Sequence, residues 1–168
     1  LGINALDAIT SNGGNNTAIG YGSLTASSDG ISNTAVGMWA LKSCTSGNNN
    51  NALGVDALRD CTEGHSNVAL GRDAIKEVTT GDYNIGIGRE SGSNLKTGDY
   101  NILIGSMTAT SANSSENQIV IGTRGVGHGD KIVVIGDADT STFSNGIEVI
   151  TNNCTAWHPP SNNKTDLG

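Results

Sequence analysis

The residues with catalytic or metal-binding chemistry are few in this sequence and lie far apart. Its three histidines are His65, His128 and His158, and none belongs to an HExxH motif or to a His/Cys cluster of the kind that binds zinc. One histidine repeated around a three-fold axis would supply three ligands, so a metal shared between chains is the alternative. We expect no metal site and no cofactor.

One loose group of acidic residues lies outside the repeats described below, at Asp137, Asp139 and Glu148. A glycosidase needs two carboxylates at a defined separation in a groove. A polysaccharide-binding groove would also need more aromatic side chains than the 4% found here. We therefore predict that the chain is not an enzyme, with polysaccharide cleavage by this group as the alternative.

The segment GVGHG at 125–129 superficially resembles a loop that cradles phosphate. Such a loop follows a strand and leads into the N-terminus of a helix. The segment KIVVIG at 131–136 comes next, and it is typical of another strand. The sequence therefore predicts a turn between strands here.

Exposed aromatic side chains are well suited to contact a sugar or a protein receptor. Trp157 and His158, beside two prolines, are the candidate receptor contact, although Trp157 packed against the end of the fold is the alternative. Trp39, Tyr83 and Tyr100 lie near predicted corners and turns, where they would decorate the surface. The two tyrosines belong to a repeated TGDYN sequence, in which turn chemistry accounts for Asp82 and Asp99.

The composition excludes several classes of protein. Gly, Asn, Ser and Thr make up 78 of the 168 residues, and hydrophobic residues only 35%, so a thick core of large side chains is not expected. The net charge of −7 disfavours binding to nucleic acid or to an anionic membrane. No apolar run approaches the ~20 residues of a membrane span. We expect no nucleic-acid partner and no membrane insertion.

A 17-residue repeat organises the chain. The motif N-x-A-[ILV]-G and its variants end at glycines that recur every 17 positions without a slip, namely Gly20, Gly37, Gly54, Gly71, Gly88, Gly105 and Gly122. A degenerate copy ends at Gly2, and a last copy ends at Gly136 after a shorter interval of 14 positions. Other columns share the period: Leu24, Leu41, Leu58 and Ile75 come four positions after the glycines, and Ser27, Cys44, Cys61, Val78 and Leu95 come seven positions after.

The period and its content predict a β-solenoid. A unit of this length is too short for a βαβ crossover, and its apolar runs are too short for helices. Within 67–71, Val68 and Leu70 point to one face of a strand and Ala69 to the other. Stacked coils would rise by ~4.8 Å each. The asparagine column would cap turns or form a ladder along the stack.

The three cysteines, Cys44, Cys61 and Cys154, form no CxxC motif. Cys44 and Cys61 are separated by one full period, so they occupy one column of the stack, in a slot that other coils give to Val, Leu and Ala. We interpret them as two small buried apolar side chains, with a disulfide as the alternative.

A single solenoid of this kind would be thin and would leave an apolar stripe in water. The simplest remedy is a symmetric oligomer in which three chains bury the stripe around a common axis. We therefore expect a homotrimer.

The repeated unit N-T-A-[IV]-G-x-x-[SA]-L resembles repeats of phage tail fibre and tailspike proteins. It is also similar to the head repeats of trimeric autotransporter adhesins, whose unit is shorter. The resemblance covers about residues 1–136. It implies an all-β fold, a left-handed parallel β-roll intertwined as a homotrimer that stands on a surface.

The C-terminal region favours the phage fibre over the adhesin. Residues 1–122 are expected to form the repeat β-roll, 123–150 a terminal β element that closes it, and 151–168 a segment leading to a downstream region. The sequence NNKTDLG at 162–168 resembles the junction upstream of chaperone regions in phage fibres. The resemblance implies a virion tail fibre that recognises the host through a surface glycan or protein and contacts other tail proteins. A location on the bacterial cell surface, as an adhesin head, is the alternative, as is a polysaccharide-cleaving tailspike fragment.

Overall fold

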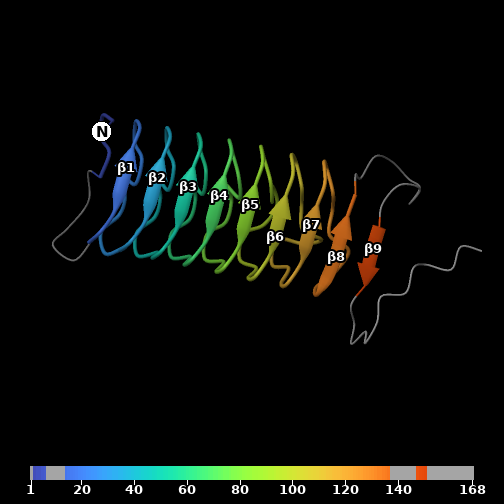
Figure 1. Ribbon diagram of the computed structural model, residues 1–168. Coiled ribbons are helices and arrows are strands. Elements are labelled where there is room, and N and C mark those ends of the chain that lie inside the picture. Colours follow the sequence, from blue (N-terminus) through green and yellow to red (C-terminus); the bar gives the residue numbers. More distant parts are fainter. Residues whose placement is uncertain (1, 7–13, 137–146, 151–168) are drawn as a thin grey trace, which may run out of the picture.

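The computed structural model describes residues 2–6, 14–136 and 147–150. In these residues the chain is an all-β parallel solenoid of about 7 turns with a repeat of ~17 residues, and it contains no helix (Figure 1). All nine strands belong to one sheet, in chain order: β1 (Thr17–Ile19), β2 (Thr34–Val36), β3 (Asn51–Leu53), β4 (Val68–Leu70), β5 (Ile85–Ile87), β6 (Ile102–Ile104), β7 (Ile119–Ile121), β8 (Ile132–Ile135) and β9 (Ile147–Ile150).

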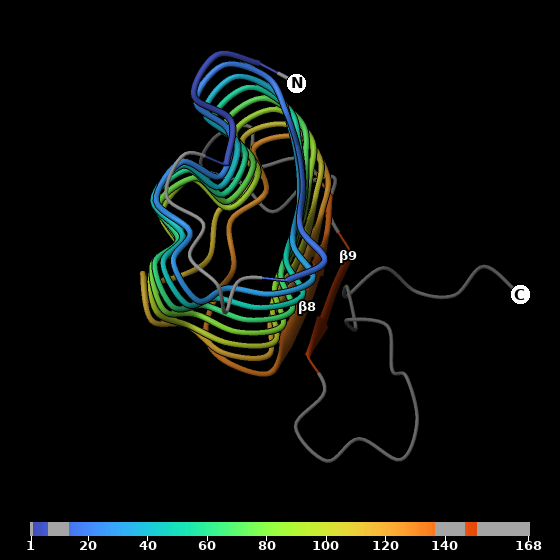
Figure 2. The same cartoon turned by 90° about the vertical axis from the view of Figure 1, so that its left-hand side faces the viewer.

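The spacing of the glycines reappears as the register of the sheet. From β1 to β7 each strand residue pairs with the residue 17 positions later, as Ala18 does with Ala35. Between β7 and β8 the offset falls to 14, as the last spacing predicts, and Val120 pairs with Val134. Strand β9 runs antiparallel to β8 and so ends the parallel stack. Viewed from the end, successive coils superpose, and the strands form one wall of the solenoid (Figure 2).

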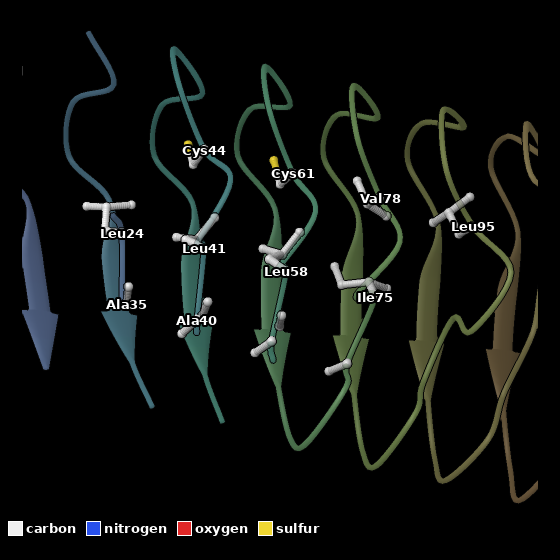
Figure 3. Close-up of a cluster of buried hydrophobic side chains, with 14 of the residues drawn as sticks. Leu24, Ala35, Ala40, Leu41, Cys44, Leu58, Cys61, Ile75, Val78 and Leu95 are labelled. Carbon is white, nitrogen blue, oxygen red and sulfur yellow. The ribbon is translucent and has the colours of Figure 1, made fainter. Parts of the chain in front are cut away.

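From β1 to β7 each strand sends only its middle residue into the interior. Ala52 is buried whereas Asn51 and Leu53 on either side of it are exposed. This confirms the alternation expected from the sequence, and the small face is the one that points inward. The turn segments supply the larger inner side chains, with Leu41 and Leu58 in one column and Cys44 and Cys61 in another (Figure 3). The core is therefore a stack of thin layers, one per coil.

Backbone stacking at the corner after each strand requires glycine. Gly71 has a φ of +133°, which L side chains rarely adopt. A Cβ on Gly71 would also lie 2.7 Å from the carbonyl oxygen of Gly88 in the next coil. Conformation and space therefore exclude any side chain at this corner.

A ladder of buried amides joins the coils, as the asparagine column predicted. The Oδ1 of Asn50 accepts the backbone N–H of Asn67 at 2.9 Å, and its Nδ2 donates to the carbonyl oxygen of Gly64 at 2.7 Å. Each amide therefore bonds the next coil and caps a turn at the same time. The same two kinds of bond recur at Asn16, Asn33, Asn67, Asn84 and Asn101.

Large and small inner side chains exchange places along the stack. In the early coils a leucine of the turn segment faces an alanine of the strand, but later Gly92 takes the turn position and Leu103 the strand position. A Cβ on Gly92 would lie 2.6 Å from Leu103 Cδ1 and 2.6 Å from Ile75 Cγ2. A Cβ on Gly86 would likewise lie 2.7 Å from Ile75 Cγ2. The interior therefore stays filled although its parts come from different segments.

The last parallel coil returns to the sheet through residues 125–129. Ala109 donates its backbone N–H to Gly125 and accepts that of Gly127, at 2.8 and 2.9 Å. Strand β8 then follows. These residues form the turn between strands that the sequence predicted, in place of a phosphate-cradling loop.

Candidate functional site

Several of the predicted candidates lie outside the described residues. Trp157, His158, Asp137, Asp139 and Cys154 all belong to the undescribed ranges. Glu148 lies in β9, where only the backbone is described. The candidate receptor contact and the candidate acidic group therefore remain predictions.

The titratable side chains of the described coils are dispersed. No group of three or more His, Cys, Asp or Glu residues there could hold a metal ion. His65 and His128 lie in different coils, and His128 is exposed. The described part of the chain therefore does not bring its two histidines together.

His65 and the two turn aspartates have a structural role between coils. The Nδ1 of His65 accepts the backbone N–H of Asn48 at 3.0 Å. The N–H of His65 in turn donates to Asp82 Oδ1 at 2.6 Å, and that of Asp82 to Asp99 Oδ1 at 2.7 Å. The sequence predicted turn chemistry within one coil, whereas these side chains bond the turn of the preceding coil.

Cys44 and Cys61 are buried free thiols, which confirms their interpretation as small core side chains. They lie one above the other in adjacent coils (Figure 3). The hydrogen bond with Cys44, together with burial, raises the pKa of the Cys61 thiol. This thiol is therefore inert at neutral pH.

The basic side chains of the middle coils pair with neighbouring carboxylates. Arg59 contacts Asp60 at 2.8 Å, and Arg72 contacts Glu90 of the next coil at 3.1 Å. Lys76, Arg89 and Lys96 make similar contacts. These exposed pairs contribute little to stability, and they leave no cluster of free cations in these coils to hold an anion.

The outer face of the sheet carries a continuous apolar strip. One outward column is aliphatic in every coil: Ile19, Val36, Leu53, Leu70, Ile87, Ile104, Ile121 and Ile135. The other changes along the stack: Thr17, Thr34, Asn51, Val68, Ile85, Ile102, Ile119 and Val133. Leu53 is 50% exposed and Ile135 41%. The apolar strip is thus one column wide over β1–β3 and two columns wide from β4 to β8.

An aromatic cluster lies at the corner of the first coils. The rings of Tyr21 and Trp39 meet edge to face with centroids 6.4 Å apart, and Lys42 Nζ lies 5.5 Å from the Trp39 ring centroid. The indole fills the space above Gly22, where a Cβ would lie 2.8 Å from Trp39 Cδ1. Packing between coils therefore accounts for Trp39.

A second aromatic pair lies at the outer turn of later coils. The rings of Tyr83 and Tyr100 stack in parallel, with centroids 4.9 Å apart and planes inclined by 3°. Both rings are about half exposed. The sequence placed the two tyrosines on the surface, and their separation by one full period was the signal that they would stack.

The comparisons with known proteins leave the function open. No protein-family model, no curated protein and no solved structure matches the chain. Within the described residues, no helical segment has the length and apolar character needed to cross a bilayer.

Proposed function

We propose that this chain is a structural and host-recognition segment of a trimeric phage tail fibre. It forms a left-handed β-roll that trimerises, stands on the virion, and binds a glycan or protein receptor on a bacterial surface without catalysis. Other tail proteins adjoin it in the fibre. The proposal is supported by the repeat resemblance and by one structural observation, the aliphatic outer face of the sheet.

The size of the outer face supports association. Eight strands ~4.8 Å apart give a length of about 34 Å, and the strip is about 10 Å wide over β4–β8 and about 5 Å wide over β1–β3. The strip therefore measures on the order of 300 Å², which is comparable to the largest apolar patches on monomers and is typical of functional surfaces.

The area of the strip favours an assembly of three chains over a dimer. A two-fold dimer through this face alone would bury about 600 Å² in total, whereas stable interfaces bury about 1,600 Å². In a ring of three, each chain also contacts a second neighbour through the columns that flank the sheet. Exposed Tyr21, Met38 and Val55 follow the corner glycines and supply apolar contacts there.

Adsorption to cells tests the attachment function. The fluorescently labelled chain should bind a subset of bacterial strains in a panel, and the unlabelled chain should compete. Stripping the surface glycans or treating the cells with protease identifies the receptor class. Saturable binding to no strain of a broad panel would argue against an attachment role. Tail genes beside the coding sequence would support a virion, whereas a membrane-anchor sequence downstream would place the chain on the bacterial cell.

A further inference from the structure

We propose that the open face of Tyr83, together with His65 and Ser66, forms a shelf that binds one pyranose ring of a neutral saccharide. This inference rests on the proposed attachment function and names its ligand class.

Tyr83 and Tyr100 belong to a column of turn residues that stack from coil to coil. The backbone N–H of Tyr83 donates to the carbonyl oxygen of His65 at 3.0 Å, and that of Tyr100 donates to Asp82 at 3.0 Å. The same bond recurs throughout the column, which consists of Ser32, Asn49, Ser66, Tyr83, Tyr100 and Asn117. Two adjacent slots therefore hold aromatic rings, and the slots on either side hold small side chains.

Turn preference and core packing leave the two tyrosines unexplained. Tyr83 has a φ of 56° and Tyr100 a φ of 59°, a region that suits Gly, Asn and Asp. The rings are 50% and 55% exposed, so they fill no core. Serine or asparagine serves the same turn in the other coils. The two tyrosines therefore add an exposed aromatic surface that is not required to form the turn or to fill the core.

The slot next to Tyr83 has the depth of one ring. The two tyrosines cover one face of each other, and the remaining face of Tyr83 points along the stack toward the coil of Ser66. Ser66 is too short to cover it. A ring that took this slot would continue the stack at the 4.9 Å separation already present between the tyrosines. Sugar rings pack their apolar C–H face on aromatic faces in this way.

Polar groups for sugar hydroxyls surround this slot. The Nδ1 of His65 accepts a backbone N–H, so the Nε2 of the same ring is the atom that can bond a sugar hydroxyl. The hydroxyl of Ser66 and the side-chain amide of Asn49 make no hydrogen bond within the described residues. These groups are neutral hydrogen-bonding partners, and Asp82 already accepts a backbone N–H through Oδ1. The other open face, that of Tyr100, lies toward Glu116 and Asn117. The hydroxyl, amide and imidazole groups around Ser66 therefore suit the hydroxyls of a saccharide, and the Asp82 carboxylate beside His65 can accept a hydrogen bond from one as well.

Saturation-transfer difference NMR on the full chain tests the shelf. The probes are tetrasaccharides of glucose, galactose, mannose and N-acetylglucosamine, with spermine as a cationic probe. At least one tetrasaccharide should bind, with magnetisation transfer strongest to the protons of one ring face. The double variant Tyr83→Ser with Tyr100→Ser should lower its affinity at least about tenfold. Serine already occupies this column at positions 32 and 66, so the turn can accept it.

Matched variants separate the shelf from nonspecific effects. Tyr83→Phe keeps the ring and should bind within about twofold of the natural chain. His65→Asn should preserve the turn, because asparagine at the equivalent position 48 accepts a backbone N–H from Ile31 at 2.7 Å. The variant should weaken saccharide binding about threefold, because it removes the imidazole Nε2 from the shelf.

The proposal is overturned if no tetrasaccharide binds, if the double variant binds as well as the natural chain, or if spermine alone binds. The molar mass of every variant is measured as well, so that a loss of saccharide binding can be distinguished from a loss of the trimer. A trimer that adsorbs to cells but binds no saccharide at Tyr83 would overturn the shelf alone.

Discussion

The early coils, β1 to β4, and the late coils, β5 to β8, share one backbone arrangement but differ in their inner and outer side chains. The early coils place leucine or isoleucine in the turn segment and alanine in the strand, and their second outward column begins with Thr17 and Thr34. The late coils place Leu103 and Val120 in the strand. Their second outward column is isoleucine or valine throughout.

The comparison shows which parts of a coil are required and which are interchangeable. Corner glycines and ladder amides recur in both halves because backbone stacking and buried hydrogen bonds permit few substitutes. Inner side chains vary because only their combined volume is constrained. The outer face varies for another reason: it is apolar in two columns where we expect contact with other chains.

A charge on the outer face should have the largest effect, and a larger one in the late coils than in the early coils. Thr34 and Ile102 occupy equivalent positions in β2 and β6. Ile102→Asp should dissociate the trimer, because three carboxylates would be buried near one axis. Thr34→Asp should weaken assembly less, because the apolar strip is only one column wide at β2. Size-exclusion chromatography with light scattering measures both. Equal effects of the two substitutions would show that the halves do not differ in their outer contacts.

The amide ladder should be equally costly to break in either half. Asn50→Ala removes the acceptor for Asn67 N–H and the donor to Gly64, and Asn84→Ala removes the same bonds to Asn101 and Gly98. Each variant leaves two buried backbone groups without partners, so we expect a loss of about 4 kcal/mol in the free energy of unfolding. Urea denaturation at fixed protein concentration measures the loss. A difference of more than about 2 kcal/mol between the two variants would show that the amide ladder does not stabilise the two halves equally.

Because large and small inner side chains exchange places between the halves, a substitution in the strand should be compensated by one in the turn segment. Leu103→Ala should cost about 3 kcal/mol through the cavity it leaves. Gly92→Leu alone should also destabilise, because its side chain would collide with Leu103 and Ile75. The double variant rebuilds the early filling and should recover at least about half of the summed loss. Leucine tolerates the backbone there, since Leu41 and Leu58 have positive φ at the equivalent position. Strict additivity in a double-mutant cycle would refute the exchange.

Alkaline pH should weaken the early coils slightly, because they contain the two buried cysteines. The pKa of Cys61 is raised by its bond to Cys44 and by burial, so the native thiol keeps a proton that the unfolded chain loses above about pH 8.5. The unfolded state then binds fewer protons, and stability falls as pH rises. We expect a loss of about 1 kcal/mol at pH 9.5 relative to pH 7.5. The double variant Cys44→Val with Cys61→Val, which copies Val78 of the same column, should abolish that loss. Cys61→Val alone should not, because the bond to Cys61 is the main effect that lowers the pKa of Cys44 against the effect of burial. An unchanged pH dependence of the double variant would contradict the assignment.

Periodicity alone predicts the strands, their register, the amide ladder and the free thiols, because each depends on residues in one column. The exchange between Gly92 and Leu103 could not be predicted from the sequence, since it depends on which columns meet inside the coil. The bonds of Asp82 and Asp99 to the preceding coil escaped notice because the same residues suit an ordinary turn. The open face next to Ser66 was missed because a small polar residue gives no signal until its neighbours are known.

The molar mass of the natural chain in solution tests the central claim most directly. Light scattering after size-exclusion chromatography should give three times the chain mass of 17.1 kDa. That mass should persist on dilution to the nanomolar range, as expected for chains that share an apolar face. A stable, folded species of 17.1 kDa would contradict the account.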